Sequence, residues 1–304
     1  MRREMNPQKA KAAPGCKAAP ALVSFALIFS ACAGTVRAQN PDDLMPAQSA
    51  AKARSILDDA VAALGGEAYL HVRDTDCKGT YGAFDTVTGE SDSAIPARFT
   101  RQYPDKSRTE MDSKSFLTDI YGIPINLKGR MVMVYTPEGA WSITKAGVTD
   151  MGPDAVNTYK EQLKNDMNTL LRTRLNEDGL ILRYGGADLI DLKQVDWVEV
   201  TDKDHKTTRI AFDRKTHLPV RSVALSRDAI TNIRVETART YTNYHLIGGI
   251  EIPFQSSIII NDHPQSQVFY SSCQANMGVA RDLFARPGFD PNAAPGSAKP
   301  GGKN

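Results

Sequence analysis

Apolar positions recur with two different periods along the chain, and the change of period divides it into segments. From Ser49 to Leu64 the apolar residues stand three and four positions apart, which places them on one face of a helix. Gly65 and Gly66 follow directly, and glycine readily adopts the left-handed conformation that ends a helix. The opposite face carries charged residues, so the pattern predicts a helix that covers another part of the protein.

Beyond His71 the period changes to two, which is typical of strands. The alternating segments are separated by Gly, Pro and Asp, and they span residues 74–84, 94–103, 106–112 and 115–120. Met131–Tyr135 and Trp141–Thr144 follow as a predicted hairpin around a turn that contains Gly139. Because Met131–Tyr135 is apolar on both faces, we expect it to be covered on both sides or to turn one face toward an apolar cavity.

A second helical pattern begins near Pro153 and continues to Arg174. Its apolar positions follow the period of 3.6 residues; they include Val156, Tyr159, Leu163, Met167, Leu170 and Leu171. An amphipathic helix inserted between two blocks of strands is expected to pack across the concave face of the sheet. It would serve there either as a plain cover for the core or as a lid.

From Leu189 to Cys273 the alternation is almost continuous, which predicts half-buried antiparallel strands. These patterns together predict a single α+β domain, residues 49–285, built on one large antiparallel sheet. Residues 39–48 are expected to form a loose lead-in. The Pro-, Gly- and Ala-rich residues 286–304 are expected to form a disordered tail.

The first 38 residues have the pattern of a secretory signal peptide. A basic beginning precedes the apolar run Ala18–Ala33, and Val36–Ala38 offers small residues for cleavage before Gln39. The run is shorter than the ~20 apolar residues that a membrane span needs. Cleavage before Gln39 would change the net charge of the chain. Residues 1–38 contain six of the 37 basic and one of the 35 acidic residues, so their removal lowers the net charge from +2 to −3. We therefore expect a periplasmic protein without a nucleic-acid partner.

Four cysteines divide between the leader and the mature chain. Cys77 and Cys273 remain after cleavage, and an even pair in an exported chain favours a disulfide, the alternative being two separately buried thiols. Cys32 follows Phe29–Ala31 in a stretch similar to a bacterial lipobox, which would make Cys32 a site of lipid attachment and anchor the protein. The alternative is a cysteine inside an ordinary apolar segment, with cleavage further on.

No sequence motif for catalysis is present. The five histidines include no pair with helical metal-site spacing, and there is no Gly-x-Ser-x-Gly elbow, phosphate-binding loop or Rossmann glycine pattern. We therefore predict no catalytic residue, no metal site and no cofactor. A hydrolase built from carboxylates that are distant in sequence is the enzyme alternative.

Aromatic and methionine residues gather in the predicted strands and in the second helix. They would form either an ordinary core or the wall of a lipid-sized cavity between sheet and helix, since such cavities are mostly apolar. The residues predicted to line this cavity are Met131, Met133, Trp141, Tyr159, Leu163, Met167, Leu170 and Trp197.

A family resemblance is carried by the stretch from Asp213 to Phe254. The turn Asp213–Arg221, followed by a strand and by Gly249–Phe254, resembles the LolA/LolB-like outer-membrane lipoprotein-sorting superfamily, as does the helix end Ala63–Glu67. The resemblance implies an open, strongly curved antiparallel sheet, an unclosed barrel whose mouth is covered by helices. It also implies periplasmic carriage of lipid or lipoprotein acyl chains. His217 stands where relatives commonly have Gly.

Three functions remain open on the sequence. The first is a carrier of lipid or lipoprotein acyl chains, with transient contact to a membrane or a membrane protein. The second is a non-transporting sensor or scaffold module that uses the same cavity. The third is an exported hydrolase. The sequence contains no catalytic motif, which favours binding over catalysis.

Overall fold

The computed structural model describes residues 43–85, 91–113, 117–120, 123–125, 129–227 and 232–288, all within one compact unit. The predicted signal peptide, Cys32 and most of the predicted tail lie outside these residues. Within the described part of the chain, no helix is both long enough and apolar enough to cross a membrane.

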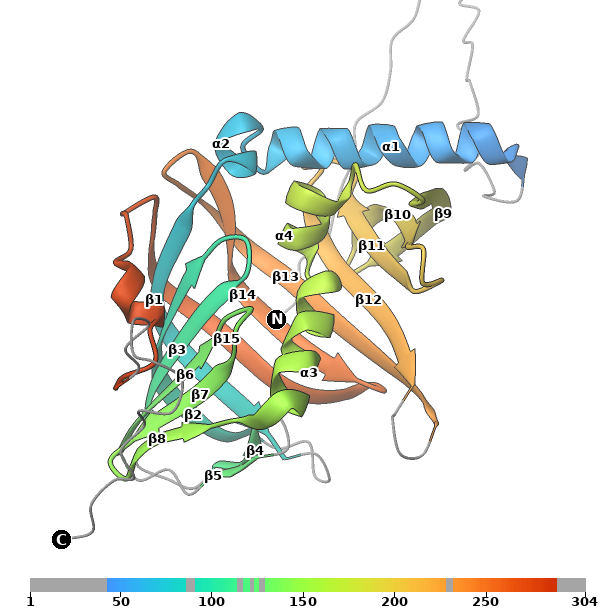
Figure 1. Ribbon diagram of the computed structural model, residues 1–304. Helices are drawn as coiled ribbons and strands as arrows, with labels where there is room; N and C mark the ends of the chain where they lie inside the picture. The colour runs from blue at the N-terminus through green and yellow to red at the C-terminus, as the bar shows by residue number, and fades with distance from the viewer. Residues whose placement is uncertain are drawn as a thin grey trace, which may run out of the picture. The chain divides into compact units, whose positions relative to one another are not determined.

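One antiparallel sheet of thirteen strands dominates the described residues (Figure 1). The strand order is β8-β7-β6-β3-β2-β1-β15-β14-β13-β12-β11-β10-β9, so the edge strands β8 and β9 do not pair and the sheet stays open. This confirms the predicted open antiparallel sheet. Its strands are β1 (Asp74–Phe84), β2 (Ser91–Gln102), β3 (Lys106–Ser113), β6 (Gly129–Tyr135), β7 (Ala140–Thr144), β8 (Gly147–Asp150), β9 (Ile181–Ile190), β10 (Lys193–Thr201), β11 (Thr207–Asp213), β12 (Pro219–Arg227), β13 (Arg234–Ile247), β14 (Ile250–Ile260) and β15 (His263–Ala275). β4 (Leu117–Ile120) and β5 (Ile123–Ile125) pair only with each other.

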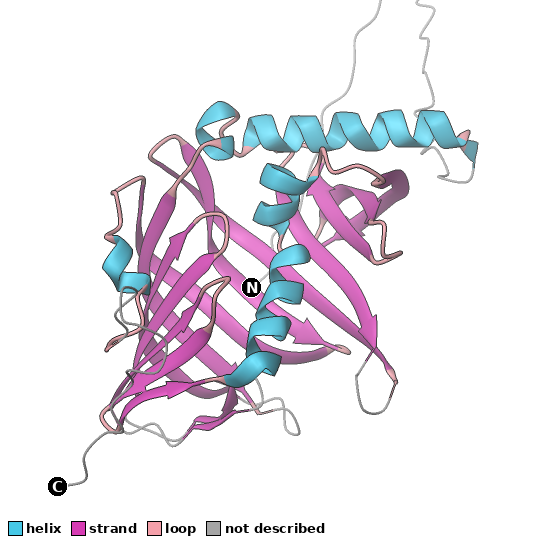
Figure 2. Cartoon of the chain, in the orientation of Figure 1, coloured by secondary structure: helices cyan, strands magenta, loops and turns pink. Residues whose placement is uncertain are grey.

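The α-helices lie on one side of the curved sheet (Figure 2). They are α1 (Pro46–Ala63), α2 (Glu67–Leu70), α3 (Gly152–Lys164) and α4 (Met167–Thr169), the last continued by a π-helical turn, Leu170–Arg174. A short 3-10 helix, Arg281–Phe284, lies on the other side. In Figure 1, α1 crosses one end of the sheet while α3 runs along its concave face.

Two predicted boundaries differ from the structure, and one predicted helix is broken. α1 begins at Pro46, inside the segment expected to be a loose lead-in, and the strands of the second block begin at Ile181, before Leu189. The prediction of one continuous helix to Arg174 is wrong. Asp166 interrupts it, because its Oδ2 accepts hydrogen bonds from the N–H groups of Asn168 (3.1 Å) and Thr169 (3.2 Å) and so caps a new helical segment.

Helix α1 closes the core over the β9–β12 end of the sheet. Ala53, Leu57 and Ala60 are fully buried and pack in one cluster with Val198 and Phe212. Three small or branched side chains on one helical face thus sit against the sheet with no gap for solvent, which is how an ordinary core is filled.

Both ends of α1 are attached to strands. At its start, the Ser49 hydroxyl oxygen accepts a hydrogen bond from the backbone N–H of Tyr184 in β9 (2.9 Å). At its end, the carbonyl of Leu64 accepts from the N–H of Glu251 in β14 (2.9 Å). Gly65 is left-handed there (φ 125°), and a Cβ would stand 2.4 Å from a carbonyl oxygen of the β13–β14 turn, so only glycine fits.

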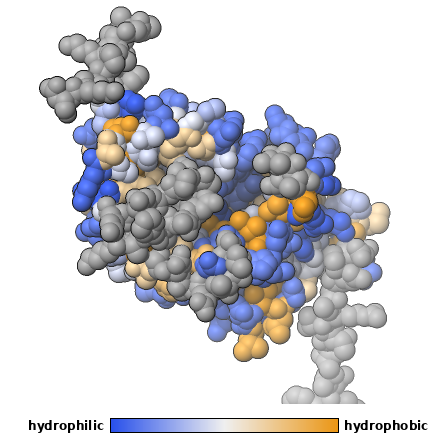
Figure 3. All heavy atoms as spheres, turned by 90° about the horizontal axis from the view of Figure 1, so that it is seen from below, coloured by the Kyte–Doolittle hydropathy of each residue, from blue (hydrophilic) through white to orange (hydrophobic). Residues whose placement is uncertain are grey.

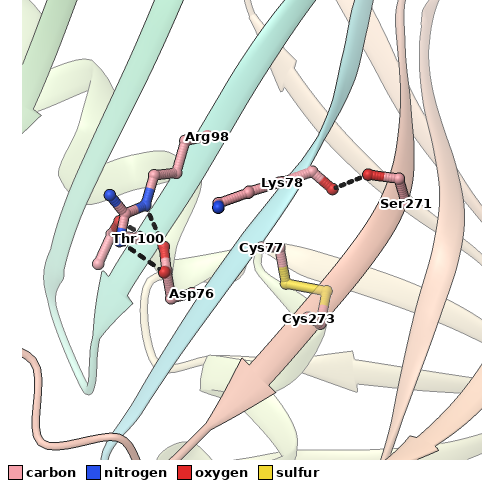
Figure 4. The surroundings of a disulfide bond; sticks show 7 residues. All are labelled: Asp76, Cys77, Lys78, Arg98, Thr100, Ser271 and Cys273. Atoms are coloured by element: carbon pink, nitrogen blue, oxygen red, sulfur yellow. Dashed lines mark hydrogen bonds and ion pairs between the residues drawn. A yellow bond between two sulfur atoms is a disulfide. The ribbon is translucent and has the colours of Figure 1, made fainter.

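The predicted disulfide is present. Cys77 in β1 and Cys273 in β15 stand directly opposite each other, with an S–S distance of 2.10 Å (Figure 4). Beside it, Asp76 pairs with Arg98 of β2 (2.7 Å) and accepts a hydrogen bond from Thr100 (3.0 Å). The bridge and this ion pair tie together three neighbouring strands.

His217 occupies a left-handed position in the turn between β11 and β12, with φ 59°. The turn is held by Asp213, whose carbonyl accepts from the His217 N–H (2.7 Å) and whose Oδ1 accepts from the Lys215 N–H (2.7 Å). The backbone therefore accommodates histidine in a conformation that favours glycine, with the strain offset by these local hydrogen bonds.

β6 is covered on both faces, as its double apolar pattern predicts. Met131 and Met133 belong to a cluster that packs with Val156 of α3. Val134 faces the other way and packs with Phe284 of the 3-10 helix. The C-terminal segment and α3 thus cover opposite sides of the same strand.

Candidate ligand cavity

A cavity of about 450 Å³ lies between the concave face of the sheet and the α3–α4 segment. This volume falls in the range of about 300–1,000 Å³ that is usual for small-molecule sites. Much of the lining is apolar; its members include Phe99, Met111, Met133, Ile252, Ile258 and Val268. They come from β2, β3, β6, β14 and β15, so segments from both halves of the sequence build one wall.

Helix α3 spans this cavity without filling it. None of its thirteen residues is buried, although Tyr159 and Leu163 line the cavity on its inner side. The Tyr159 ring stacks on Tyr135 of β6 (ring centroids 4.7 Å apart), and its hydroxyl donates to the carbonyl of Asp105 (3.2 Å). The helix is therefore held at its side while its apolar face remains partly open to the hollow.

Two arginines lie near the α4 end of the cavity. Nη1 of Arg101 stands 3.8 Å from Oδ1 of Asp166. Burial lowers the pKa of Arg101 but the Asp166 carboxylate raises it, and the balance is upward. Arg172 lies over the ring of Tyr103 (3.9 Å) and donates to the carbonyl of Val72. Burial lowers the pKa of Arg172, yet both guanidiniums remain charged at neutral pH, because arginine does not deprotonate in proteins.

A third arginine, Arg239 of β13, lines the cavity from the opposite side. Its charge acts on Tyr241: burial raises the pKa of that hydroxyl, while Arg239 and Arg101 both lower it. Tyr241 shares a hydrogen bond with Ser222 (3.0 Å). Arg239 of β13 and Arg101 of β2 thus line the same cavity, and both charges act on the same tyrosine.

Tyrosine hydroxyls supply the remaining polar groups. Burial raises the pKa of Tyr69, Tyr159 and Tyr270, so all three are neutral at physiological pH and can donate hydrogen bonds. Tyr69 donates to Oδ1 of Asn168 (3.0 Å). The Tyr270 hydroxyl has no hydrogen-bond partner within the residues that the structure describes.

Three of the eight residues predicted to line the cavity do so: Met133, Tyr159 and Leu163. Met131 lies in the same cluster as Met133 but is only 1% exposed and does not reach the cavity. Met167 and Leu170 are drawn away, because the break at Asp166 turns their segment into the core under α1. These two side chains fill the core, while Asn168, Thr169 and Arg172 of the same segment line the cavity together with α3.

The two tryptophans belong to different clusters altogether. Trp141 packs with Val134 and Phe284, beneath the 3-10 helix. Trp197 packs with Ala211 and donates its Nε1–H to Asp188 (3.1 Å). Neither lines the cavity, because successive strand residues point to opposite faces and both tryptophans take the face turned away.

Across the described part of the chain, no three His, Cys, Asp or Glu side chains converge in a way that could hold a metal ion. Viewed from below, hydrophobic residues gather near the middle and at the edge of the face opposite α1 (Figure 3). The cavity thus offers apolar surface with tyrosine hydroxyls and guanidiniums. This combination suits binding of an amphipathic molecule.

Comparison with protein-family models finds no match, and comparison with curated proteins finds none either. Among solved structures, a DUF1329 family protein from Desulfovibrio piger is 12% identical, with a TM-score of 0.51. A putative outer membrane lipoprotein-sorting protein domain from Vibrio parahaemolyticus is 13% identical, and a LolA superfamily protein from Nitrosomonas europaea is 12% identical, each with a TM-score of 0.47. Each match covers 77% of this chain and 97% of the other. At these identities the likeness concerns architecture, and the chain has the fold of the Desulfovibrio piger protein.

Proposed function

We propose that this protein binds an acyl chain of a lipid or lipoprotein in the cavity beneath α3. The observation that carries the proposal is that α3 presents an apolar face to the sheet yet buries none of its residues. An amphipathic helix gains stability mainly by burying that face. Apolar surface held open toward a hollow therefore remains available to a ligand.

An acyl chain matches the apolar part of this surface. Each methylene group removed from water contributes about 0.8 kcal/mol, so a chain of about a dozen methylenes gains roughly 10 kcal/mol before the losses of association. Methionine side chains such as Met111 and Met133 adapt to a flexible chain, since the thioether has several accessible rotamers. Binding is thus supported without any catalytic group.

The signal pattern of residues 1–38 and the resemblance of Asp213–Phe254 support a periplasmic carrier. A sensor with the same cavity would bind the same acyl chain but would not release it to a membrane. Transfer of a bound lipid to acceptor vesicles would therefore favour the carrier. Lipid attachment at Cys32 would add an anchor to either function.

Binding can be tested with a cavity-filling variant and a matched control on the same strand. Val268 lines the cavity, whereas its neighbour Phe269 is 44% exposed on the other face of β15. Val268→Trp should weaken binding of an uncharged alkyl ligand by at least about tenfold, and Phe269→Trp should leave it unchanged. Displacement of the uncharged fluorophore phenylnaphthylamine by dodecanol measures both. The proposal fails if wild-type protein shows no saturable binding, or if Val268→Trp binds as wild type does.

A further inference from the structure

The charges around the cavity do not balance. Its lining includes five basic and three acidic side chains: Arg101, Lys106, Arg108, Arg172 and Arg239 against Asp154, Asp166 and Glu251. Arg108 pairs with Glu110 outside the lining set, at 2.9 Å. The hollow nonetheless keeps more positive than negative charge in a setting where water screens poorly.

Arg239 carries a charge that no residue in the described part of the chain compensates. Within the residues that the structure describes, its guanidinium makes neither a hydrogen bond nor an ion pair. A guanidinium has five N–H donors in a rigid fork. A partly buried charge without a counter-charge loses hydration that nothing in the fold replaces, which costs free energy unless a ligand supplies an anion.

The positive charge of Arg101 is only weakly compensated by a carboxylate. Its sole carboxylate neighbour in the described part of the chain, Asp166, stands at 3.8 Å, longer than a hydrogen bond. The second oxygen of Asp166 is already engaged by the N–H groups of Asn168 and Thr169. Asp166 is therefore only a partial counter-charge for Arg101, and Arg101 and Arg239 line the same cavity.

Resting on the proposed function, we propose that the cavity selects an amphipathic ligand with an anionic head group, a carboxylate or a phosphate, bound between Arg239 and Arg101. The Tyr270 hydroxyl, which lines the same space and has no partner among the described residues, adds a neutral donor. Charge-assisted hydrogen bonds from a guanidinium to such an anion are about twice as strong as neutral ones. The tail lies along Met133 and Val268, where the wall is apolar.

The test compares ligands that share one tail and differ in the head group. Dodecanoate and dodecyl phosphate carry the anion, and dodecanol does not; acetate and inorganic phosphate carry the anion without the tail. Each competes with the uncharged fluorophore phenylnaphthylamine for the exported protein with its disulfide intact. Wild-type protein should be occupied by both anionic alkyl ligands at a concentration about tenfold lower than by dodecanol. Acetate and inorganic phosphate should not displace the fluorophore.

Substitutions test which arginine is responsible for the preference for anionic alkyl ligands over dodecanol. Arg239→Gln should reduce the tenfold preference for the anionic alkyl ligands over dodecanol to below about threefold, and Arg239→Lys should restore part of it. Arg98→Gln is the matched control, since Arg98 lies on β2 like Arg101 but pairs with Asp76 and does not line the cavity. It should keep the full preference. Thermal unfolding of each variant verifies that it is folded.

The outcomes separate the two proposals. If no alkyl ligand displaces the fluorophore, the proposed function itself fails. If all three alkyl ligands displace it equally, or if Arg239→Gln keeps the preference, acyl binding stands and the anionic head-group site is refuted. Displacement by inorganic phosphate or acetate as strong as by the alkyl anions would likewise refute an amphipathic ligand.

Discussion

Helices α1 and α3 both lie over the concave side of the sheet, yet they meet it in different ways. α1 buries Ala53, Leu57 and Ala60 completely against β10 and β11. α3 buries no residue and leaves a cavity of about 450 Å³ beneath it. Both helices are amphipathic in sequence. Amphipathicity thus indicates which face of a helix turns inward, whereas the spacing between helix and sheet decides whether that face meets a core or a cavity.

The largest expected effect concerns the disulfide, which joins the two regions: Cys77 lines the cavity, and both cysteines belong to the core cluster that contains Leu57. Cys77 and Cys273 join β1 and β15 across a sequence separation of 196 residues. Replacing both with Ala should lower the free energy of unfolding by up to about 5 kcal/mol, since the chain-entropy model gives this value for so long a loop. Urea unfolding of the double variant and of the non-reduced wild type measures the difference. A loss below about 1 kcal/mol would show that the wall is stable without the bond.

The stability of the core under α1 should depend strongly on its buried side chains. Leu57→Ala removes a fully buried residue from α1 and should lower the free energy of unfolding by about 3 kcal/mol, through lost transfer energy and a new cavity. Leu163→Ala, the corresponding change in α3, should lower it by less than about 1 kcal/mol, because Leu163 already borders a cavity. Equal losses in urea unfolding would contradict the contrast between the two helices.

Ligand affinity should depend on Leu163 more than on Leu57, the opposite of the order expected for stability. Leu163→Ala should weaken the binding of dodecanol by about five- to tenfold, because it removes apolar surface that faces the ligand. Leu57→Ala lies in the α1 core and should leave the affinity within about twofold at a temperature where the variant is folded. Isothermal titration of both variants checks this. An unchanged affinity for Leu163→Ala would place the ligand elsewhere.

The smallest expected effect concerns the ion pair between Asp76 of β1 and Arg98 of β2, neither of which lines the cavity. The hydrogen bond from Arg98 lowers the pKa of Asp76, burial opposes it, and Thr100 adds to the lowering. A carboxyl with a lowered folded-state pKa stabilises the fold above its unfolded pKa of about 3.9, and this contribution disappears as pH falls through the folded pKa. Asp76→Asn should therefore cost about 0.5–1 kcal/mol at neutral pH, since Arg98 is 45% exposed.

Urea unfolding at a series of pH values follows this contribution. The difference between wild type and Asp76→Asn should shrink as the pH is lowered toward about 2. A difference that stays constant over this range would show that the carboxylate charge is not what stabilises the fold.

Much of the secondary structure could be predicted from the sequence, because periodicity is local. The predicted strand 74–84 matches β1, and the predicted end of the first helix lies within one residue of the end of α1. The single long helix to Arg174 was wrong for a reason visible in one residue. Asp166 lies inside the helical pattern of the sequence, yet Asp favours the cap position that it occupies in the structure.

The cavity lining was harder to predict, because both faces of several strands are apolar. Trp141 and Trp197 look like lining residues by size, but the face that each one takes depends on how the sheet curves and on which segment covers its back. That information is not local. Arg239 could have been recognised from the sequence. It lies two residues before Tyr241 on the same strand, so its charged side chain points to the same inward face.

Photolabelling with an uncharged alkyl diazirine tests the central claim, that the hollow beneath α3 holds an acyl chain while the α1 core does not. The folded protein is irradiated with the probe and labelled peptides are identified by mass spectrometry, with excess dodecanol as competitor. We expect label that dodecanol displaces on α3 (Gly152–Lys164) and on the cavity-facing strands β6 and β15, and no label on α1 (Pro46–Ala63). Label on α1, or label that dodecanol does not displace, would contradict it.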